Sequence, residues 1–140
     1  MSDRPLRIVY ADDEEDILSV ATLSLEMVGG HSVRGCRSGR EAIEEALQDL
    51  PDVVMLDVMM PGMDGPSTMK VMRSMHEFDG LPIVLITARV RPSEVQEYLA
   101  LGACGVITKP FDPMALPGEV SSLVRDGSRG VARARSAPGD

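Results

Sequence analysis

Short apolar runs alternate with amphipathic segments five times along the chain. The runs at 6–11, 52–56 and 81–87 are mainly aliphatic, and those at 31–36 and 104–108 are weaker. Continuous apolar runs of this length are typical of parallel strands that are covered on both faces. Each run is followed by a segment whose apolar residues recur at helical spacing. The pattern predicts five strands that alternate with five helices.

Residues that favour helix starts precede four of the predicted helices, namely Ser38, Pro66, Ser93 and Pro113. Ser38 is followed three residues later by Glu41, which makes a capping box. The first helix, predicted over 16–28, ends at the pair Gly29-Gly30. The side chains expected to face the sheet are Leu18, Ala21, Leu25, Val28, Ile43, Ala46, Leu47, Leu50, Met69, Met72, Met75 or His76, Leu116, Val120, Leu123 and Val124.

The alternation of strands and helices predicts an α/β fold, with a doubly wound five-stranded parallel sheet between two helical layers. Right-handed crossovers favour the flavodoxin-like strand order 2-1-3-4-5. The 140 residues suit a single domain. We expect residues 1–126 to form it. Residues 127–140 are rich in Gly, Ser, Arg, Ala and Pro, and are expected to be a disordered tail or the start of a linker.

Composition and charge argue against several classes of function. Residues 1–124 hold twenty acidic and ten basic side chains, so this domain is not expected to bind nucleic acid, which requires a basic face. Neither of the glycine-rich nucleotide-binding motifs occurs, which disfavours a nucleotide-binding enzyme. No apolar run reaches the length of a membrane span, and the first residues lack a signal-peptide core. We therefore expect a cytoplasmic protein without a membrane partner.

Polar residues that can carry chemistry follow four of the predicted strands. Asp12 and Asp13 follow the first strand, Asp57 the third, Thr87 the fourth and Lys109 the fifth. Strands 1 and 3 are expected neighbours, so three carboxylates should converge at the carboxyl edge of the sheet. Such like charges repel one another unless a cation is present, and oxygen ligands suit Mg²⁺. This set favours phosphoryl transfer, with Asp57 as the nucleophile and Lys109 as a mobile positive charge.

The loop after Asp57 offers a further metal ligand. A turn at Pro61-Gly62 lets the chain bend away and frees the backbone carbonyl of Met59. At the end of the fourth strand, Thr87 supplies a hydroxyl, and Ala88 is small enough to let a phosphoryl group approach. Each feature alone is weak, and their joint occurrence at the strand ends is what is specific.

Four stretches together resemble the receiver domain of bacterial two-component response regulators, and in particular single receivers like the chemotaxis regulators. The stretches are ADDEED (11–16), LDVMMPGMDG (56–65), ITA (86–88) and TKPF (108–111). The resemblance covers residues 6–126. It implies a phosphoacceptor signalling protein that catalyses only its own phosphorylation and dephosphorylation, rather than an enzyme with an external substrate.

The resemblance also implies a role for each site residue. Asp57 would accept a phosphoryl group from the phosphohistidine of a sensor histidine kinase or a phosphotransfer protein. Asp13, Asp57 and the Met59 carbonyl would hold Mg²⁺, with Asp12 assisting through water. Lys109 would contact the phosphoryl group and precede a cis peptide bond to proline. Thr87 would move toward the phosphoryl group and so bias a two-state surface on helix 4, strand 5 and helix 5.

One position departs from the family pattern. Three residues before the lysine the family usually has an aromatic residue that moves together with the threonine, and here that residue is Val106. We expect phosphorylation to be retained, while the coupling to the output surface changes. That surface also carries Arg89, Arg91 and Tyr98, and it would contact a downstream protein whose identity the sequence does not give.

Three alternatives remain open from the sequence. One is that the chain is the receiver portion of a longer transcriptional or enzymatic regulator. Another is a receiver-like binding module that takes no phosphate, which only Val106 supports. The third is a phosphatase with an aspartate nucleophile, which would need an acid where Met59 stands.

The side chains of Met59 and Arg89 are expected to border the phosphoryl group. The apolar Met59 offers nothing to orient an attacking water, so we expect the phosphoryl group to be lost slowly, over minutes or longer.

Overall fold

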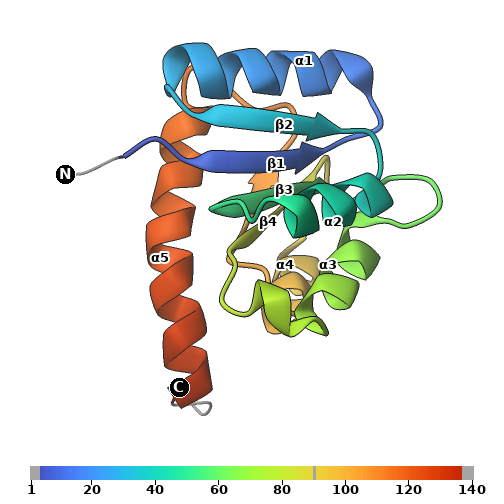
Figure 1. The fold of residues 1–140 in the computed structure, drawn as a ribbon, viewed down its shortest axis with the longest axis vertical. Coiled ribbons are helices and arrows are strands. Elements are labelled where there is room, and N and C mark those ends of the chain that lie inside the picture. The colour runs from blue at the N-terminus through green and yellow to red at the C-terminus, as the bar shows by residue number, and fades with distance from the viewer. Residues whose placement is uncertain (1–3, 90, 137–140) are drawn as a thin grey trace.

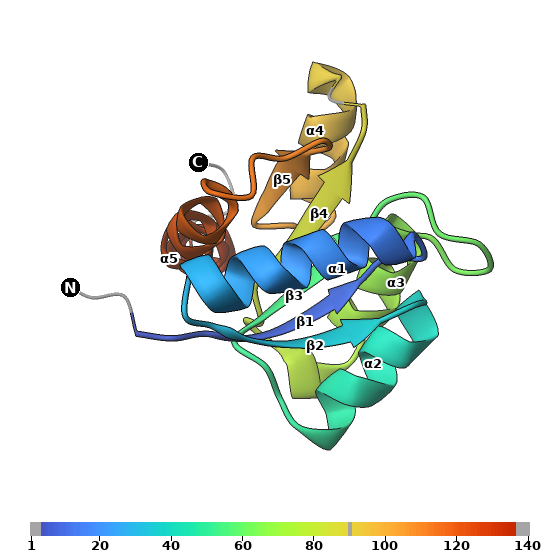
Figure 2. The same ribbon diagram turned by 90° about the horizontal axis from the view of Figure 1, so that it is seen from above.

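Five parallel strands form the centre of the computed structural model, which describes residues 4–89 and 91–136, with side chains as far as Asp126. The strands are β1 (Arg7–Ala11), β2 (Ser32–Cys36), β3 (Val53–Asp57), β4 (Ile83–Thr87) and β5 (Gly105–Thr108). All neighbours are parallel, in the order β2-β1-β3-β4-β5. Figure 1 shows β2, β1, β3 and β4, and Figure 2 also shows β5 next to β4. The predicted fold class and strand order are confirmed.

Helices cover both faces of the sheet, as Figure 2 shows. The helices are α1 (Glu15–Leu23), α2 (Gly39–Gln48), α3 (Gly65–Arg73), α4 (Pro92–Ala100) and α5 (Leu116–Ser136). The helix predicted over 16–28 continues past α1 as the π-helical η1 (Ser24–Val28), a form that was not predicted. The 3₁₀ turn η2 (His76–Phe78) was not predicted either. The result is the three-layer arrangement expected for a doubly wound sheet.

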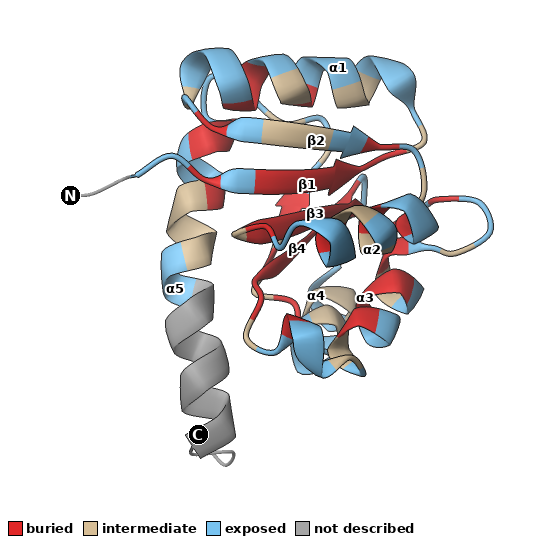
Figure 3. Ribbon diagram, in the orientation of Figure 1, coloured by how far each residue is buried: buried red, intermediate tan, exposed pale blue. Residues whose placement is uncertain are grey.

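Alternate strand residues contribute to two separate apolar cores. Ile8 and Tyr10 of β1 belong to the core under α1 and α5, whereas Val9 and Ala11 belong to the core under α2 and α3, which also contacts α4. Figure 3 shows the central strands buried along almost their whole length. Burial of each aliphatic side chain contributes about 1.5–3 kcal/mol. Two-sided burial is the physical reason for the continuous apolar runs in the sequence.

The register of the sheet brings the carboxyl ends of neighbouring strands to one level. Ala11 of β1 pairs with Leu56, the residue before Asp57. Between β4 and β5, Thr87 pairs with Thr108, the residue before Lys109. The residues that follow these strands therefore share one edge of the molecule, which is where the sequence placed its candidate site.

Three residues predicted to face the sheet are exposed instead. They are Val28, Leu47 and Leu50. The π-helical turn of η1 shifts the helical phase, so Leu25 is buried while Val28 is not. In α2 the buried contacts come from small residues, because a Cβ atom at Gly39 would lie only 2.0 Å from Thr68 Oγ1 of α3.

The helix starts were predicted correctly only in part. Ser38 Oγ accepts from the Glu41 N–H at 3.1 Å, as expected, but the Glu41 carboxylate accepts from the N–H of Arg37 instead of Ser38. The prediction for Ser93 was wrong: α4 starts one residue earlier, at a proline, whose missing N–H would have no helical partner at this position, and its N-cap Arg91 makes no side-chain cap.

The third and fifth helices also begin differently. The N-cap of α3 is Asp64, whose carboxylate accepts from the N–H of Ser67 at 2.8 Å, and Pro66 follows in the first turn. Pro113 lies in a turn before α5, which begins at Leu116. In that turn Asp112 Oδ1 accepts from the N–H of Met114 at 2.9 Å.

The backbone of α5 continues to Ser136, past residue 126, where the sequence analysis ended the domain. Residues 137–140 of the expected tail lie outside the described residues, and the division of the chain at 126 stays a prediction. None of the helices in the described part of the chain is long and apolar enough to cross a membrane.

Candidate metal centre at the carboxyl edge of the sheet

Three carboxylates converge where β1 and β3 end. Asp57 is the last residue of β3, and Asp12 and Asp13 directly follow β1. One oxygen from each carboxylate lies within 4.8 Å of the others. Asp12 and Asp57 are buried, and Asp13 is half-buried. The strand ladder fixes this arrangement, because the Asp12 N–H donates to the Cys36 carbonyl at 3.0 Å and Asp57 pairs with Ile86.

Lys109 brings a cation into this acidic cleft from the end of β5. Its Nζ lies 2.9 Å from Asp57 Oδ1 and 3.1 Å from Asp12 Oδ2. The Lys109 side chain is largely buried, so its charge is screened less than that of a surface lysine. The peptide bond between Lys109 and Pro110 is cis, as the family resemblance implied. Four of the five side chains predicted to form the site, namely Asp12, Asp13, Asp57 and Lys109, thus lie together.

The environment shifts the pKa values of the two central groups. Burial raises the pKa of Asp57 to about 6, and the neighbouring Asp12 and Asp13 carboxylates add to this, against the opposing effect of Lys109. Burial alone would lower the pKa of Lys109, but its hydrogen bonds to Asp57, Glu14 and Asp12 outweigh that effect and raise it. At neutral pH the site therefore holds an ionised nucleophile next to a firmly charged lysine.

Thr87, the fifth predicted position, lies at the same edge as the last residue of β4. Its side chain is buried, and its Oγ1 accepts a hydrogen bond from the N–H of Arg89 at 3.1 Å. Val58, which follows Asp57, donates its N–H to the carbonyl of Ile86 at 2.8 Å, which ties the Asp57 backbone to β4. The Thr87 hydroxyl is thus placed beside the cleft but is engaged by its own loop.

The loop after Asp57 turns sharply away from the sheet. Gly62 has a positive φ of 83°, and the Met63 N–H donates to the Pro61 carbonyl at 3.0 Å. The Met59 side chain is exposed, and no hydrogen bond from the described residues reaches its carbonyl. The chain returns at Gly65, where a Cβ atom would lie 2.5 Å from the Asp57 carbonyl oxygen. Only glycine permits this close approach.

Sequence reasoning missed two residues that contact the acidic cluster. The Tyr10 hydroxyl donates to Asp12 Oδ2 at 3.5 Å, and burial raises the pKa of this phenol. The Glu14 N–H donates to Asp12 Oδ1 at 2.9 Å, and Glu14 Oε1 lies 2.9 Å from Lys109 Nζ. The spacing of Asp12 and Glu14 is that of an Asx turn, a signal that was available in the sequence.

The donor set of the cleft fits a hard divalent cation. Asp12, Asp13 and Asp57 supply only oxygen ligands, which suits Mg²⁺. A cation between them would relieve the repulsion that helps to raise the pKa of Asp57. The chemistry of the residues is thus consistent with a magnesium centre.

The match to a known family comes from comparison of the whole sequence. A family model described as the response regulator receiver domain matches residues 8–121. The chain belongs to this family. Receiver domains are the signal-receiving modules of two-component systems, not enzymes that act on an external substrate. The resemblance noted in the sequence is thereby confirmed at the level of the family.

Individual relatives agree with this assignment. The chain is 38% identical over 121 residues to the response regulator MprA of Mycolicibacterium vanbaalenii, covering 86% of this chain and 51% of the relative. It is 34% identical over 119 residues to the alkaline phosphatase synthesis transcriptional regulatory protein PhoP of Bacillus subtilis, covering 85% of this chain and 48% of the relative. The chain spans about half the length of these curated relatives.

A solved structure gives the same result for the fold. The chemotaxis response regulator CheY4 of Vibrio cholerae superposes with a TM-score of 0.80 at 30% identity, covering 86% of this chain and 99% of that one. This likeness supports the fold and the strand order described above.

Proposed function

We propose that this receiver domain accepts a phosphoryl group on Asp57, in a Mg²⁺-dependent reaction, from the phosphohistidine of a sensor histidine kinase or a phosphotransfer protein. One observation carries the proposal. The Asp57 carboxylate lies at the floor of a cluster of three carboxylates, 2.9 Å from the ammonium of Lys109. A buried carboxylate that lies beside a lysine ammonium and beside further carboxylates able to ligate a metal ion is suited to act as a nucleophile.

The transfer brings the anionic phosphoryl group up to an anionic carboxylate, so positive charge is needed at the site. A carboxylate oxygen of Asp57 attacks the phosphorus, a new O–P bond forms, and the P–N bond of the donor breaks. The electron pair of that bond returns to the imidazole nitrogen of the donor. Lys109 donates N–H bonds to the phosphoryl oxygens and offsets their charge. The pKa of Asp57, about 6, leaves the nucleophile ionised at neutral pH.

Asp12, Asp13 and Asp57 would hold the Mg²⁺, together with the backbone carbonyl of Met59. When bound, the ion supplies positive charge that offsets the phosphoryl oxygens. The exposed turn after Met59 and the absence of a hydrogen bond to its carbonyl from the described residues support this choice of ligand.

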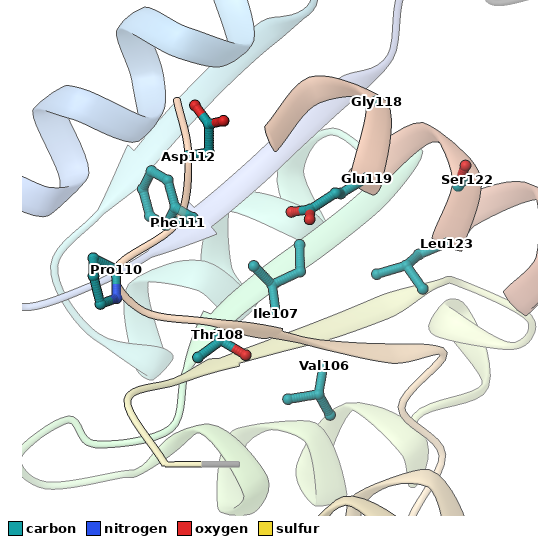
Figure 4. Close-up of a pocket in the computed structure, with 10 residues that line it drawn as sticks. All are labelled: Val106, Ile107, Thr108, Pro110, Phe111, Asp112, Gly118, Glu119, Ser122 and Leu123. Atoms are coloured by element: carbon teal, nitrogen blue, oxygen red, sulfur yellow. The ribbon is translucent and has the colours of Figure 1, made fainter. Parts of the chain in front are cut away.

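The output is proposed to be a change in the surface formed by α4, β5 and α5. A pocket of about 590 Å³ lies between β5 and α5, lined by Val106, Ile107, Thr108, Pro110, Phe111, Asp112, Gly118, Glu119, Ser122 and Leu123 (Figure 4). Thr108 and Pro110 flank Lys109 in the chain, so a shift of the Lys109 backbone toward a phosphoryl group would move the wall of this pocket. Thr87 would move with it.

Val106 gives this surface a small side chain in place of a ring. It lies half-buried at the edge of the pocket. We therefore assign the coupling to Lys109 and Thr87, and the partner to an as yet unnamed downstream protein. A binding module without phosphorylation is less well supported, because all of the acidic cluster and Lys109 are in place. The cytoplasmic location stays a prediction.

Label transfer from a small-molecule donor tests the proposal. The full chain is incubated with radiolabelled acetyl phosphate, with Mg²⁺ or with EDTA, as the wild type and as Asp57→Asn. We expect Mg²⁺-dependent label in the wild type and none in the variant, with Asp52→Asn as a control that keeps its label. Equal labelling of Asp57→Asn would overturn the proposal, and so would a folded wild type that takes no label from acetyl phosphate or a kinase.

A further inference from the structure

The carboxylate of Glu14 contacts the same ammonium group as Asp57. Glu14 Oε1 and Asp57 Oδ1 each lie 2.9 Å from Lys109 Nζ, and Asp12 Oδ2 lies 3.1 Å from it. A lysine ammonium has three N–H donors. These three carboxylates therefore occupy every donor that Lys109 has.

Glu14 differs from the other two partners in how firmly it is held. Asp12 and Asp57 are buried, whereas the Glu14 side chain is 63% exposed. Glu14 is the N-cap residue of α1, but its side chain makes no capping bond. Its backbone is fixed, because the N–H donates to Asp12 Oδ1 at 2.9 Å and the carbonyl accepts from the N–H of Leu18 at 3.0 Å. Because the Glu14 carboxylate is mostly in water, it can leave Lys109 and remain hydrated, which Asp12 and Asp57 cannot do.

We propose that Glu14 is a positioning residue, which helps to hold the Lys109 ammonium in the resting site and competes for it with the incoming phosphoryl group. This inference rests on the proposed function of Asp57. A phosphoryl group that approaches Asp57 brings anionic oxygens that need a donor from Lys109. Since all three donors are occupied, the weakest partner must give way, and Glu14 is the exposed one. Its contact therefore slows phosphorylation.

Two variants separate this contact from a general effect of negative charge. Glu15 is the next residue, is 68% exposed, and contacts Arg37 Nη1 at 2.6 Å instead of Lys109. Glu15→Gln thus removes the same charge as Glu14→Gln without touching Lys109. Glu14→Asp keeps the charge but shortens the side chain by one methylene, so its carboxylate withdraws from Lys109.

The first readout is the rate of labelling by acetyl phosphate at saturating Mg²⁺. We expect Glu14→Gln and Glu14→Asp to label about two- to fivefold faster than the wild type, the range for loss of one exposed ion pair. Glu15→Gln should stay close to the wild-type rate. If Glu14→Asp labels at the wild-type rate, or Glu14→Gln matches Glu15→Gln, the proposal is overturned.

The second readout observes Lys109 directly in the metal-free, unphosphorylated protein. The chain has only two lysines, Lys70 and Lys109, so their ¹⁵N-labelled ammonium signals are readily assigned. Ammonium hydrogen exchange of Lys109 should be faster in both Glu14 variants and unchanged in Glu15→Gln. Unchanged exchange in the Glu14 variants contradicts the contact. A wild type that takes no label overturns the proposed function and this inference with it, whereas a labelled wild type with no Glu14 effect overturns this inference alone.

Discussion

Lys109 Nζ lies 2.9 Å from Asp57 Oδ1, although the two residues come from the ends of β5 and β3, which are not neighbours in the sheet. The lysine reaches across the end of β4 into a cluster of three carboxylates. Among the described residues it is the buried cation that offsets their charge. Stability and chemistry of this edge therefore depend on the same contact.

Removal of this cation should destabilise the metal-free protein. In Lys109→Met the buried Asp12 and Asp57 lose their positive partner, and an uncompensated buried charge is costly. We expect the free energy of unfolding in urea to fall by about 2–4 kcal/mol at neutral pH. Lys70→Met, at an exposed position of α3, is the control and should change it by less than about 0.5 kcal/mol. Equal stability of both variants would contradict the account.

The raised pKa of Asp57 predicts that Asp57→Asn stabilises the metal-free protein at alkaline pH. The carboxyl has a pKa of about 6 in the folded state and of about 4 in the unfolded chain. Its stabilising contribution is therefore fully present below about pH 4 and is lost as the pH rises through about 6.

We expect Asp57→Asn to raise the free energy of unfolding by about 1–3 kcal/mol near pH 8, and to leave it almost unchanged near pH 4. Urea denaturation in EDTA at both pH values measures this. A variant less stable than the wild type near pH 8 would mean that the lost contact with Lys109 outweighs the cost of burying the charge.

Mg²⁺ should stabilise the wild type through the acidic cluster. At concentrations tenfold above its dissociation constant, a ligand that binds only the folded state adds about 1.4 kcal/mol. We expect millimolar Mg²⁺ to raise the thermal midpoint of the wild type, and EDTA to reverse the shift. Asp13→Asn should lose the response, whereas Asp16→Asn, exposed and outside the cluster, should keep it. A retained response in Asp13→Asn would exclude this residue as a ligand.

Gly65 should tolerate no side chain. A Cβ atom there would lie 2.5 Å from the Asp57 carbonyl oxygen and 3.0 Å from the Val58 Cα, both backbone atoms. We expect Gly65→Ala to reduce the free energy of unfolding by about 1–3 kcal/mol and to weaken Mg²⁺ binding by displacing Asp57. The matched control is Gly118→Ala in α5, where the space is open and alanine favours the helix. Calorimetric Mg²⁺ titration and urea unfolding of both variants test this.

Much of the fold could be predicted because burial on both faces leaves a strong trace in the sequence. The apolar runs of β3 and β4 are continuous, and parallel strands with helical crossovers bring their carboxyl ends to one edge. Asp12, Asp57 and Lys109 could then be placed together without coordinates. Local helix signals were less reliable, since α4 starts at a proline, one residue before the Ser93 that was expected to cap it.

The parts that the sequence did not reveal depend on side-chain reach and helix phase. Glu14 lies two residues past Asp12, but its contact with Lys109 depends on how far the lysine extends from β5. The π-helical turn that exposes Val28 has no marker in its composition.

The central claim is that the Asp57 carboxylate itself carries the phosphoryl group. The most direct test is reduction of the acetyl phosphate-treated, Mg²⁺-loaded protein with borohydride, which converts an aspartyl phosphate to homoserine, followed by peptide mass spectrometry. The account predicts homoserine at position 57 and nowhere else, and none when EDTA replaces Mg²⁺. Homoserine at Asp12 or Asp13 in place of Asp57, or an unmodified peptide from protein that carries label, would contradict it.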